Sequence, residues 1–154
     1  MPKKPELKVL NYTTDVSVHK TVAEIHELLI RAGAKSVKSD YDDDGSPVAV
    51  EFVIKTEYGM RGFRLPAKPL EVEKVLVEQY NRGIIPRASF ATPEQAERVA
   101  WRQVKDALEV QMALLQTNQV TLDQLMLGYM TTGDGRTLFD DYRDDQLLLT
   151  EGVK

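Results

Sequence analysis

The sequence of 154 residues contains no cysteine. This absence excludes disulfide bonds, thiolate nucleophiles and cysteine-ligated zinc or iron–sulfur centres, and it is typical of a reducing compartment. No apolar run approaches the length of about 18 residues that a membrane-spanning helix needs. Residues 1–5 lack the apolar core of a secretory signal. We therefore expect a cytoplasmic protein without a membrane span.

Catalytic motifs are missing as well. The chain contains no Gly-x-Ser-x-Gly nucleophile motif, no phosphate-binding loop and no dinucleotide-binding glycine pattern. It has only two histidines, His19 and His26, and a separation of seven residues on one helix is too long for a shared metal ion. We interpret His26 as a packing residue and His19 as a polar group before the helix. We expect no enzymatic activity, no cofactor and no bound metal.

Basic residues are not in excess, since 20 Lys and Arg face 24 Asp and Glu, a net charge of −4. The charge is uneven along the chain. Residues 40–60 hold six acidic residues and one basic residue, and residues 121–154 hold seven and three. Residues 1–39 and 61–91 each carry a net charge of +3. No segment has the concentrated basic stripe that is typical of phosphate binding.

The first half of the chain has the pattern of a small sheet. Residues 10–18 alternate apolar and polar side chains with a period of two, which predicts a half-buried strand. Further strands are predicted over residues 35–41, 48–56 and 61–65. A helix precedes them, with Thr21 and Glu24 as its expected capping box. The predicted fold is α+β, with a mostly antiparallel four-stranded sheet in the order β-α-β-β-β and a helical half after it.

Helical periodicity dominates the second half. The run Thr92-Pro93-Glu94-Gln95 predicts the start of the longest helix, which ends near Thr117. On it, Trp101 lies beside apolar neighbours, so we expect its ring to be mostly buried. A further capping box, Thr121 with Gln124, predicts another helix, and residues 137–142 fit either a short helix or an extended segment.

The domain organisation follows from these elements. We treat residues 1–154 as a single domain. The loop 83–91 offers one alternative boundary, which would separate an α/β part over residues 10–82 from a helical part over residues 92–142.

The acidic turn matches the calcium-loop pattern Asp-x-Asp-x-Asp-Gly-x5-Glu at every position. Asp40, Asp42 and Asp44 would supply oxygen ligands, and Glu51 would close the site. An EF-hand needs helices on both sides of this loop, however, and the flanking residues here alternate as strands. Pro47 also removes an amide donor that paired hands use. We therefore predict a hairpin turn with solvated carboxylates, and weak surface binding of a cation is the alternative.

Several segments are informative when they are taken together in this order: Tyr12–Val18, Lys20–Ile25, Ala32–Ala34, Tyr41–Gly45, Pro47–Val48, Gly62–Pro66, Gln95–Arg102 and Lys105–Asp106. With these segments the chain resembles a group of small proteins encoded by bacteriophages and integrated mobile elements. The resemblance covers most of residues 10–142. It implies a viral or mobile-element origin and a bacterial cytosol, but it implies no activity and transfers no functional residues.

The favoured functional hypothesis is a non-enzymatic, phage-type accessory protein that binds a protein partner stoichiometrically. The partner would be a component of host defence, replication or transcription. Acidic residues would contact a basic surface of that partner through charge complementarity, although acidic residues also simply maintain solubility. The candidate binding residues lie in the acidic turn and near the C-terminus: Asp40, Asp42, Asp43, Asp44, Asp140 and Asp141.

Two alternatives remain at this stage. A nucleic-acid-binding accessory of phage replication or recombination would use the basic residues Arg61, Arg64, Arg98 and Arg102, together with Arg82 and Arg87. The predicted order helix–strand–strand–strand–helix is that of a double-stranded-RNA-binding domain, but Leu70-Glu71-Val72-Glu73-Lys74 would repel phosphates where such domains place lysines. The least favoured alternative is a metal-dependent hydrolase or nuclease built on the acidic clusters.

Overall fold

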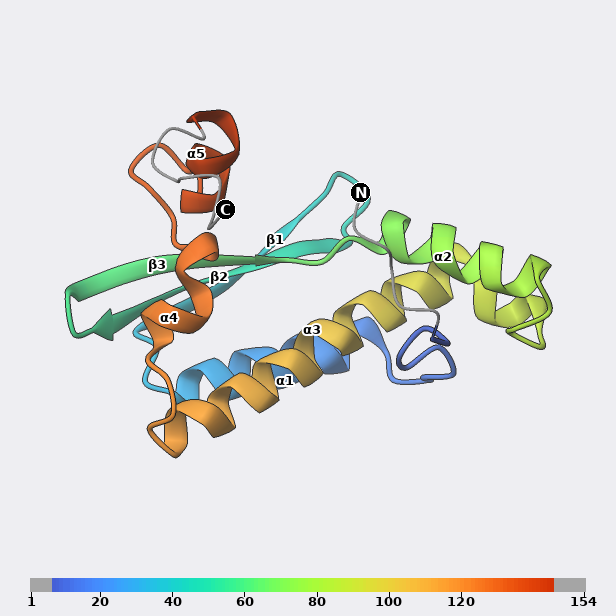
Figure 1. Cartoon of the computed structure of the whole chain (residues 1–154), viewed down its shortest axis with the longest axis horizontal. Helices are drawn as coiled ribbons and strands as arrows, with labels where there is room; N and C mark the ends of the chain where they lie inside the picture. Colours follow the sequence, from blue (N-terminus) through green and yellow to red (C-terminus); the bar gives the residue numbers. More distant parts are fainter. Residues whose placement is uncertain (1–6, 146–154) are drawn as a thin grey trace, which may run out of the picture. The chain divides into compact units, whose positions relative to one another are not determined.

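The computed structural model describes residues 7–145, and over this range the fold is α+β (Figure 1). An N-terminal helix precedes a three-stranded antiparallel sheet, and helices follow it. No helix in this range combines the length and the apolarity needed to cross a bilayer. In chain order the elements are α1 (Val18–Arg31), β1 (Ser36–Tyr41), β2 (Pro47–Thr56), β3 (Gly59–Pro66), α2 (Pro69–Asn81), η1 (Ala88–Ala91), α3 (Pro93–Gln116), α4 (Leu122–Met126), η2 (Leu127–Tyr129) and α5 (Leu138–Asp145).

The chain forms two compact units. Unit 1 combines the chain up to Ile25 with Ala67–Glu109, and unit 2 combines His26–Pro66 with the chain from Val110 onward. Each unit therefore draws on two separate stretches of sequence. The whole sheet belongs to unit 2, and the loop 83–91 belongs to unit 1.

The strand predicted over residues 10–18 is wrong, so the sheet has three strands and not four. Residues 10–13 form a turn, and Asn11 adopts a positive φ of 67°. The alternation of burial is real nevertheless, because Tyr12, Thr14 and Val16 are half-buried while Thr13 and Asp15 are exposed. A period of two reports which side chains are buried, and it does not report whether a second strand pairs with the backbone.

Glutamine side chains in unit 1 bind the backbone of this segment instead. The Gln95 amide nitrogen donates to the carbonyls of Tyr12 (2.9 Å) and Thr14 (2.8 Å). The Gln79 amide receives a bond from the Val9 N–H (3.1 Å) and donates to the Leu7 carbonyl (2.7 Å). These two glutamines are buried, so their amides satisfy backbone groups that a neighbouring strand would otherwise satisfy.

The predicted start of α1 is also wrong. The helix begins at Val18 and not after Thr21. The Ser17 hydroxyl accepts from the Lys20 N–H at 3.2 Å, which is the contact that an N-cap residue makes. Thr21 lies inside the helix and is fully buried, so the Thr21–Glu24 pair is not a capping box.

The predicted caps of the later helices are confirmed to different degrees. Thr121 and Gln124 form a complete capping box at α4. At α3, the Thr92 hydroxyl accepts from the Gln95 N–H at 3.2 Å, but the Gln95 side chain binds residues 12 and 14 instead of closing the box. Residues 138–145 form the helix α5, which decides between the two structures predicted for residues 137–142.

The sheet of unit 2 has the order β1-β2-β3, with β2 at its centre. Val50, Phe52 and Ile54 of β2 are buried, as their alternation predicts. Phe52 stacks on Phe63 of β3 with ring centroids 5.2 Å apart. In Figure 1, the last turns of α1 and α3 lie on one side of the sheet and α5 lies on the other.

Unit 1 has a separate apolar cluster. Leu76, Ile85 and Ala96 are buried together, and the ring of Tyr12 meets Phe90 edge-on with centroids 5.5 Å apart. Trp101 on α3 is fully buried, which confirms its predicted burial.

Candidate protein-binding surface

The acidic turn joins β1 to β2, which confirms the predicted hairpin. Gly45 has a φ of +80°, a conformation that glycine adopts without strain. Asp42 is not simply solvated, because its carboxylate accepts from the N–H groups of Asp44 (3.0 Å) and Ser46 (2.9 Å). Asp43 and Asp44 have exposed side chains. Asp42 therefore stabilises the turn, and the carboxylates of Asp43 and Asp44 are the ones that remain available to a partner.

Asp40 lies on β1 in a cluster of charges across the three strands. Arg64 contacts the carboxylates of Asp40 and Glu51, the latter at 2.9 Å. The Lys38 ammonium lies 2.9 Å from Glu51 and 3.6 Å from Asp40. Asp40 and Glu51 are therefore neutralised within the sheet. Of the four acidic residues in the calcium-loop pattern, Asp42 and Asp44 lie in the turn, whereas Asp40 and Glu51 belong to this ion-pair cluster.

The two other candidate carboxylates, Asp140 and Asp141, belong to α5, and Figure 1 shows this helix apart from the β1–β2 turn. Asp140 accepts from the Thr137 N–H (2.9 Å) and the Thr137 hydroxyl (3.1 Å), while its own N–H donates to that hydroxyl (3.3 Å). This reciprocal pair caps the start of α5. Asp141 binds the Arg136 guanidinium at 3.1 Å.

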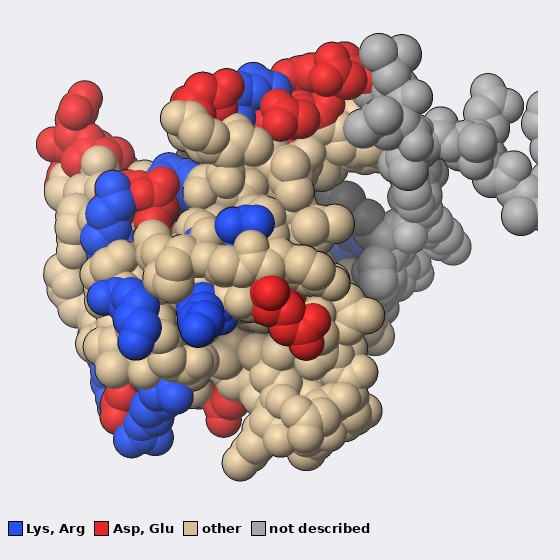
Figure 2. Space-filling model, turned by 90° about the vertical axis from the view of Figure 1, so that its left-hand side faces the viewer, with Lys and Arg blue, Asp and Glu red and all other residues tan. Residues whose placement is uncertain are grey.

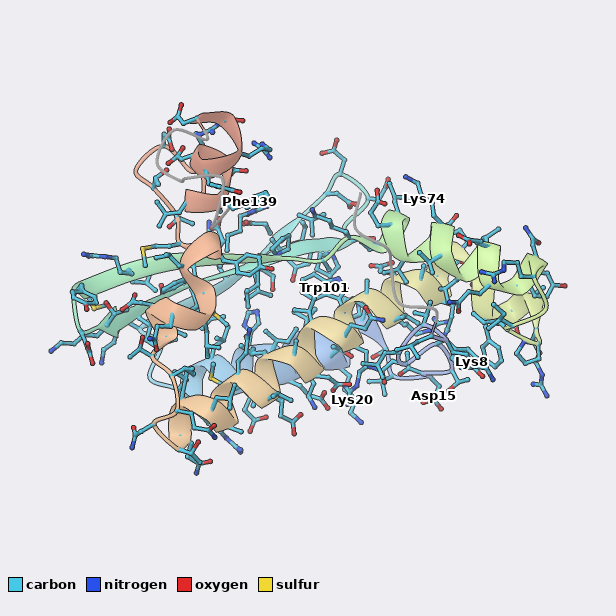
Figure 3. The ribbon with its side chains drawn as sticks, viewed as in Figure 1. Lys8, Asp15, Lys20, Lys74, Trp101 and Phe139 are labelled. Atoms are coloured by element: carbon cyan, nitrogen blue, oxygen red, sulfur yellow. The ribbon has the colours of Figure 1, made fainter. Side chains whose placement is uncertain are left out.

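The same helix, α5, and the neighbouring η2 also carry exposed apolar side chains. On α5, Phe139 (labelled in Figure 3) and Tyr142 are each 51% exposed. Their ring centroids are 6.0 Å apart. The neighbouring η2 adds Leu127 and Tyr129, which are 53% and 44% exposed. The two elements are in contact, because a Cβ on Gly128 would lie 3.7 Å from that of Phe139. We call these four residues, with the aspartates of residues 134–145, the α5 surface.

The segment that carries the α5 surface is acidic. Residues 134–145 contain five Asp and two Arg, a net charge of −3, and Figure 2 shows acidic residues gathered along the top of the view, at the height of α5. The Thr132 hydroxyl and the Arg136 N–H donate to Asp134 and lower its pKa. The Thr137 N–H lowers the pKa of Asp140, and the Arg136 guanidinium lowers that of Asp144. These three carboxylates therefore remain charged at neutral pH.

The arginines of the nucleic-acid alternative are distributed over both units, with Arg61 and Arg64 in unit 2 and Arg98 and Arg102 in unit 1. Arg64 pairs with two carboxylates, and Arg102 pairs with Glu24. Arg98 donates to Gln95 at 3.0 Å, and Arg61 donates to the Met60 carbonyl at 2.9 Å. Two of the four charges are thus compensated by acidic partners, which counts against phosphate binding by this set.

One contact joins a hydroxyl to an imidazole. The His26 Nε2 lies 2.8 Å from the Ser39 Oγ, within the range that a nucleophile and its general base need. Burial lowers the pKa of His26. Among residues 7–145, no carboxylate binds the other ring nitrogen to orient it, as a catalytic triad requires. We interpret the pair as a packing contact between α1 and β1, and His19 lies exposed on the first turn of α1.

Comparisons with protein-family models, with curated proteins and with solved structures found no match. The function is therefore inferred from the geometry of this chain. Asp140 and Asp141 of α5 were predicted from the sequence, but the aromatic residues of this helix were not. The available signal was the spacing of Phe139 and Tyr142, which places two large rings on one face of a helix that also contains two acidic pairs.

Proposed function

We propose that this chain is a non-enzymatic accessory protein that acts by binding a basic protein partner through the α5 surface. The observation that carries the proposal is the exposed pair Phe139 and Tyr142 on a segment, residues 134–145, whose net charge is −3. Aromatic side chains and arginine are enriched at the centres of protein interfaces, where a few of them supply most of the binding energy. Arg143 lies 6.0 Å from the Phe139 ring and adds to this composition.

The charge of the α5 surface indicates what kind of partner it binds. The net charge of −3 over residues 134–145 favours a basic surface with an apolar centre, because opposite potentials accelerate association and exclude acidic competitors. The resemblance to phage-encoded proteins suggests a bacterial host or phage protein of defence, replication or transcription as this partner. The acidic turn offers Asp43 and Asp44 as a separate, smaller contact.

Binding should depend on the aromatic pair more than on the turn. The test compares the wild-type chain with Phe139→Ala/Tyr142→Ala in capture from nuclease-treated bacterial lysate. Tyr58→Ala is the matched control, because Tyr58 is 71% exposed on the β2–β3 turn. We expect a basic protein that the wild type and Tyr58→Ala both retain and that the double variant loses by at least about tenfold, as for a hot-spot pair worth about 1.4 kcal/mol or more.

Titration against the captured protein then tests the mode of action. The effect on the partner should increase with the molar ratio and saturate near one equivalent. Full effect at catalytic ratios, or equal capture by the wild type and the double variant, would disprove the proposal. If the wild type captures a protein from untreated lysate but not from nuclease-treated lysate, the nucleic-acid alternative is supported instead.

The acidic turn needs a different variant from the α5 surface. Reversal of all three turn aspartates would also remove the Asp42 contacts that hold the turn. Asp43→Lys/Asp44→Lys keeps Asp42 and reverses only the exposed charges. If this variant binds the partner as the wild type does, the turn serves solubility and not binding.

A further inference from the structure

A pocket of about 310 Å³ lies on the sheet of unit 2, and its lining does not include the exposed rings of α5. Its floor includes Ser36, Val53 and Gly62, which face one another across the three strands. Thr131 and Gly135, in the segment between η2 and α5, close one side. The volume is at the lower end of the range of about 300–1,000 Å³ found for small-molecule sites, so the pocket favours a compact ligand.

The contact between Gly62 and Thr131 positions that side of the pocket. The Thr131 N–H donates to the Gly62 carbonyl at 2.8 Å. A Cβ on Gly62 would lie 2.6 Å from the Thr131 hydroxyl oxygen, closer than real Cβ contacts. The segment is therefore fastened to the edge of β3 at a residue without a side chain, and the hollow remains over β1 and β2.

The pocket contains polar groups that are available to a ligand. The hydroxyls of Ser36 and Thr131 form no hydrogen bond with any other residue in the range 7–145. Lys38 and Glu51 add one charge of each sign, and Val53 adds an apolar surface that is 36% exposed. An apolar wall with a few convergent polar groups is the usual composition of a small-molecule site.

The charge cluster makes Lys38 the group that a ligand can recruit. Lys38 and Arg64 both contact the carboxylates of Asp40 and Glu51. The Lys38 side chain is 68% exposed, whereas that of Arg64 is only 31% exposed. If Lys38 turns toward a ligand, Arg64 keeps its contacts with both carboxylates, although its single charge offsets only one of the two. The ammonium can therefore reach a ligand without leaving Asp40 or Glu51 without a cationic partner.

From this arrangement we infer that the pocket binds a small organic carboxylate. The carboxylate group of the ligand pairs with the Lys38 ammonium and accepts from the hydroxyls of Ser36 and Thr131. Its apolar body lies against Val53. A charge-assisted hydrogen bond to Lys38 distinguishes this ligand from a neutral molecule of the same shape. This binding does not depend on the function proposed for the α5 surface.

Benzoate and its neutral analogue benzamide are suitable probes, because they differ in charge but hardly in shape. Titration of the full chain is followed by two-dimensional NMR of the backbone amides. We expect benzoate to shift the signals of Ser36, Gly62, Thr131 and Gly135 in a saturable way. Benzamide should bind at least about tenfold more weakly.

Lys38→Gln is the decisive variant, and Lys55→Gln is its matched control, because Lys55 is an exposed lysine of the same sheet outside the pocket. Lys38→Gln should weaken benzoate binding at least about tenfold, and Lys55→Gln should leave it unchanged. Ser36→Phe, which fills the pocket, should abolish the shifts. Equal binding of benzoate and benzamide, equal binding by Lys38→Gln and the wild type, or benzoate shifts confined to residues outside the pocket would each overturn the inference.

Discussion

Residues 7–17 of unit 1 and β3 of unit 2 are both half-buried segments, but their backbones are satisfied in different ways. β3 pairs with β2 along its length, from Gly59 to Pro66. Residues 7–17 pair with no strand, and the amides of Gln79 and Gln95 bind their backbone instead. The Gln103 amide adds a bond to the Leu10 carbonyl at 2.8 Å. A strand ladder tolerates many side chains, whereas an anchor made of glutamine side chains depends on those particular residues. Replacing a single anchoring glutamine should therefore destabilise the N-terminal segment far more than a single polar substitution destabilises the sheet.

The largest effect expected in either unit comes from an apolar deletion. Trp101 in unit 1 is fully buried, so Trp101→Ala should reduce the free energy of unfolding by about 3–5 kcal/mol. Urea denaturation measures this change. The exposed Tyr58 provides the comparison, because Tyr58→Ala should change stability by less than about 0.5 kcal/mol. Similar effects of the two substitutions would contradict the burial of Trp101.

Gln95→Met tests the glutamine anchor directly. Methionine keeps much of the volume but cannot donate to the carbonyls of Tyr12 and Thr14, and an unsatisfied buried polar group costs about 1–3 kcal/mol. Amide hydrogen exchange should show residues 7–17 losing protection before the sheet does. Gln116→Met is the control, since Gln116 is an exposed glutamine on the same helix, α3. If protection of residues 7–17 is retained, the segment does not depend on Gln95.

In unit 2, β3 should be sensitive to an added methyl group at Gly62. Gly62→Ala places a Cβ against the Thr131 hydroxyl, and overpacking of this kind costs about 1–3 kcal/mol. The NMR signals of residues 130–138 should shift while the pairing of β2 with β3 persists. Gly133→Ala is the control, because its Cβ would meet nothing within 4 Å. Equal stability of the two variants would show that the segment is not held at Gly62.

The smallest effect concerns His26 of unit 2, whose pKa burial lowers from the ordinary value of 6.5. The unfolded chain therefore binds a proton more readily than the folded chain. Stability is complete above about pH 6.5 and falls as the pH decreases toward the lowered pKa of the folded state. The melting temperature, measured from pH 7.5 to 5, should decrease across this window.

His26→Gln should flatten that dependence, whereas His19→Gln should leave it unchanged. His19 is exposed, so it provides a histidine with the same chemistry in a solvated position. An identical slope in His26→Gln and the wild type would assign the pH dependence to other groups.

The candidate site was only partly visible in the sequence. The acidic residues were found because carboxylates are identified by residue type alone. Phe139 and Tyr142 were missed because large aromatic residues at helical spacing are usually buried, and only the folded chain shows that α5 leaves them exposed. The pocket was also missed, because Ser36, Gly62 and Thr131 are far apart in the sequence and meet only through strand pairing and the contact at Gly62.

The sequence by itself determined the features that depend on neighbouring residues. These are the β1–β2 hairpin with its positive φ at Gly45, the capping box of α4 and the buried face of β2. Tertiary structure decided whether residues 10–18 pair with a strand, and it placed Thr21 inside α1. The physical reason is that the alternation of apolar and polar side chains is set by neighbouring residues, whereas the hydrogen-bond partner of a backbone group can come from a distant part of the chain. For residues 12 and 14 that partner is Gln95, more than eighty residues away.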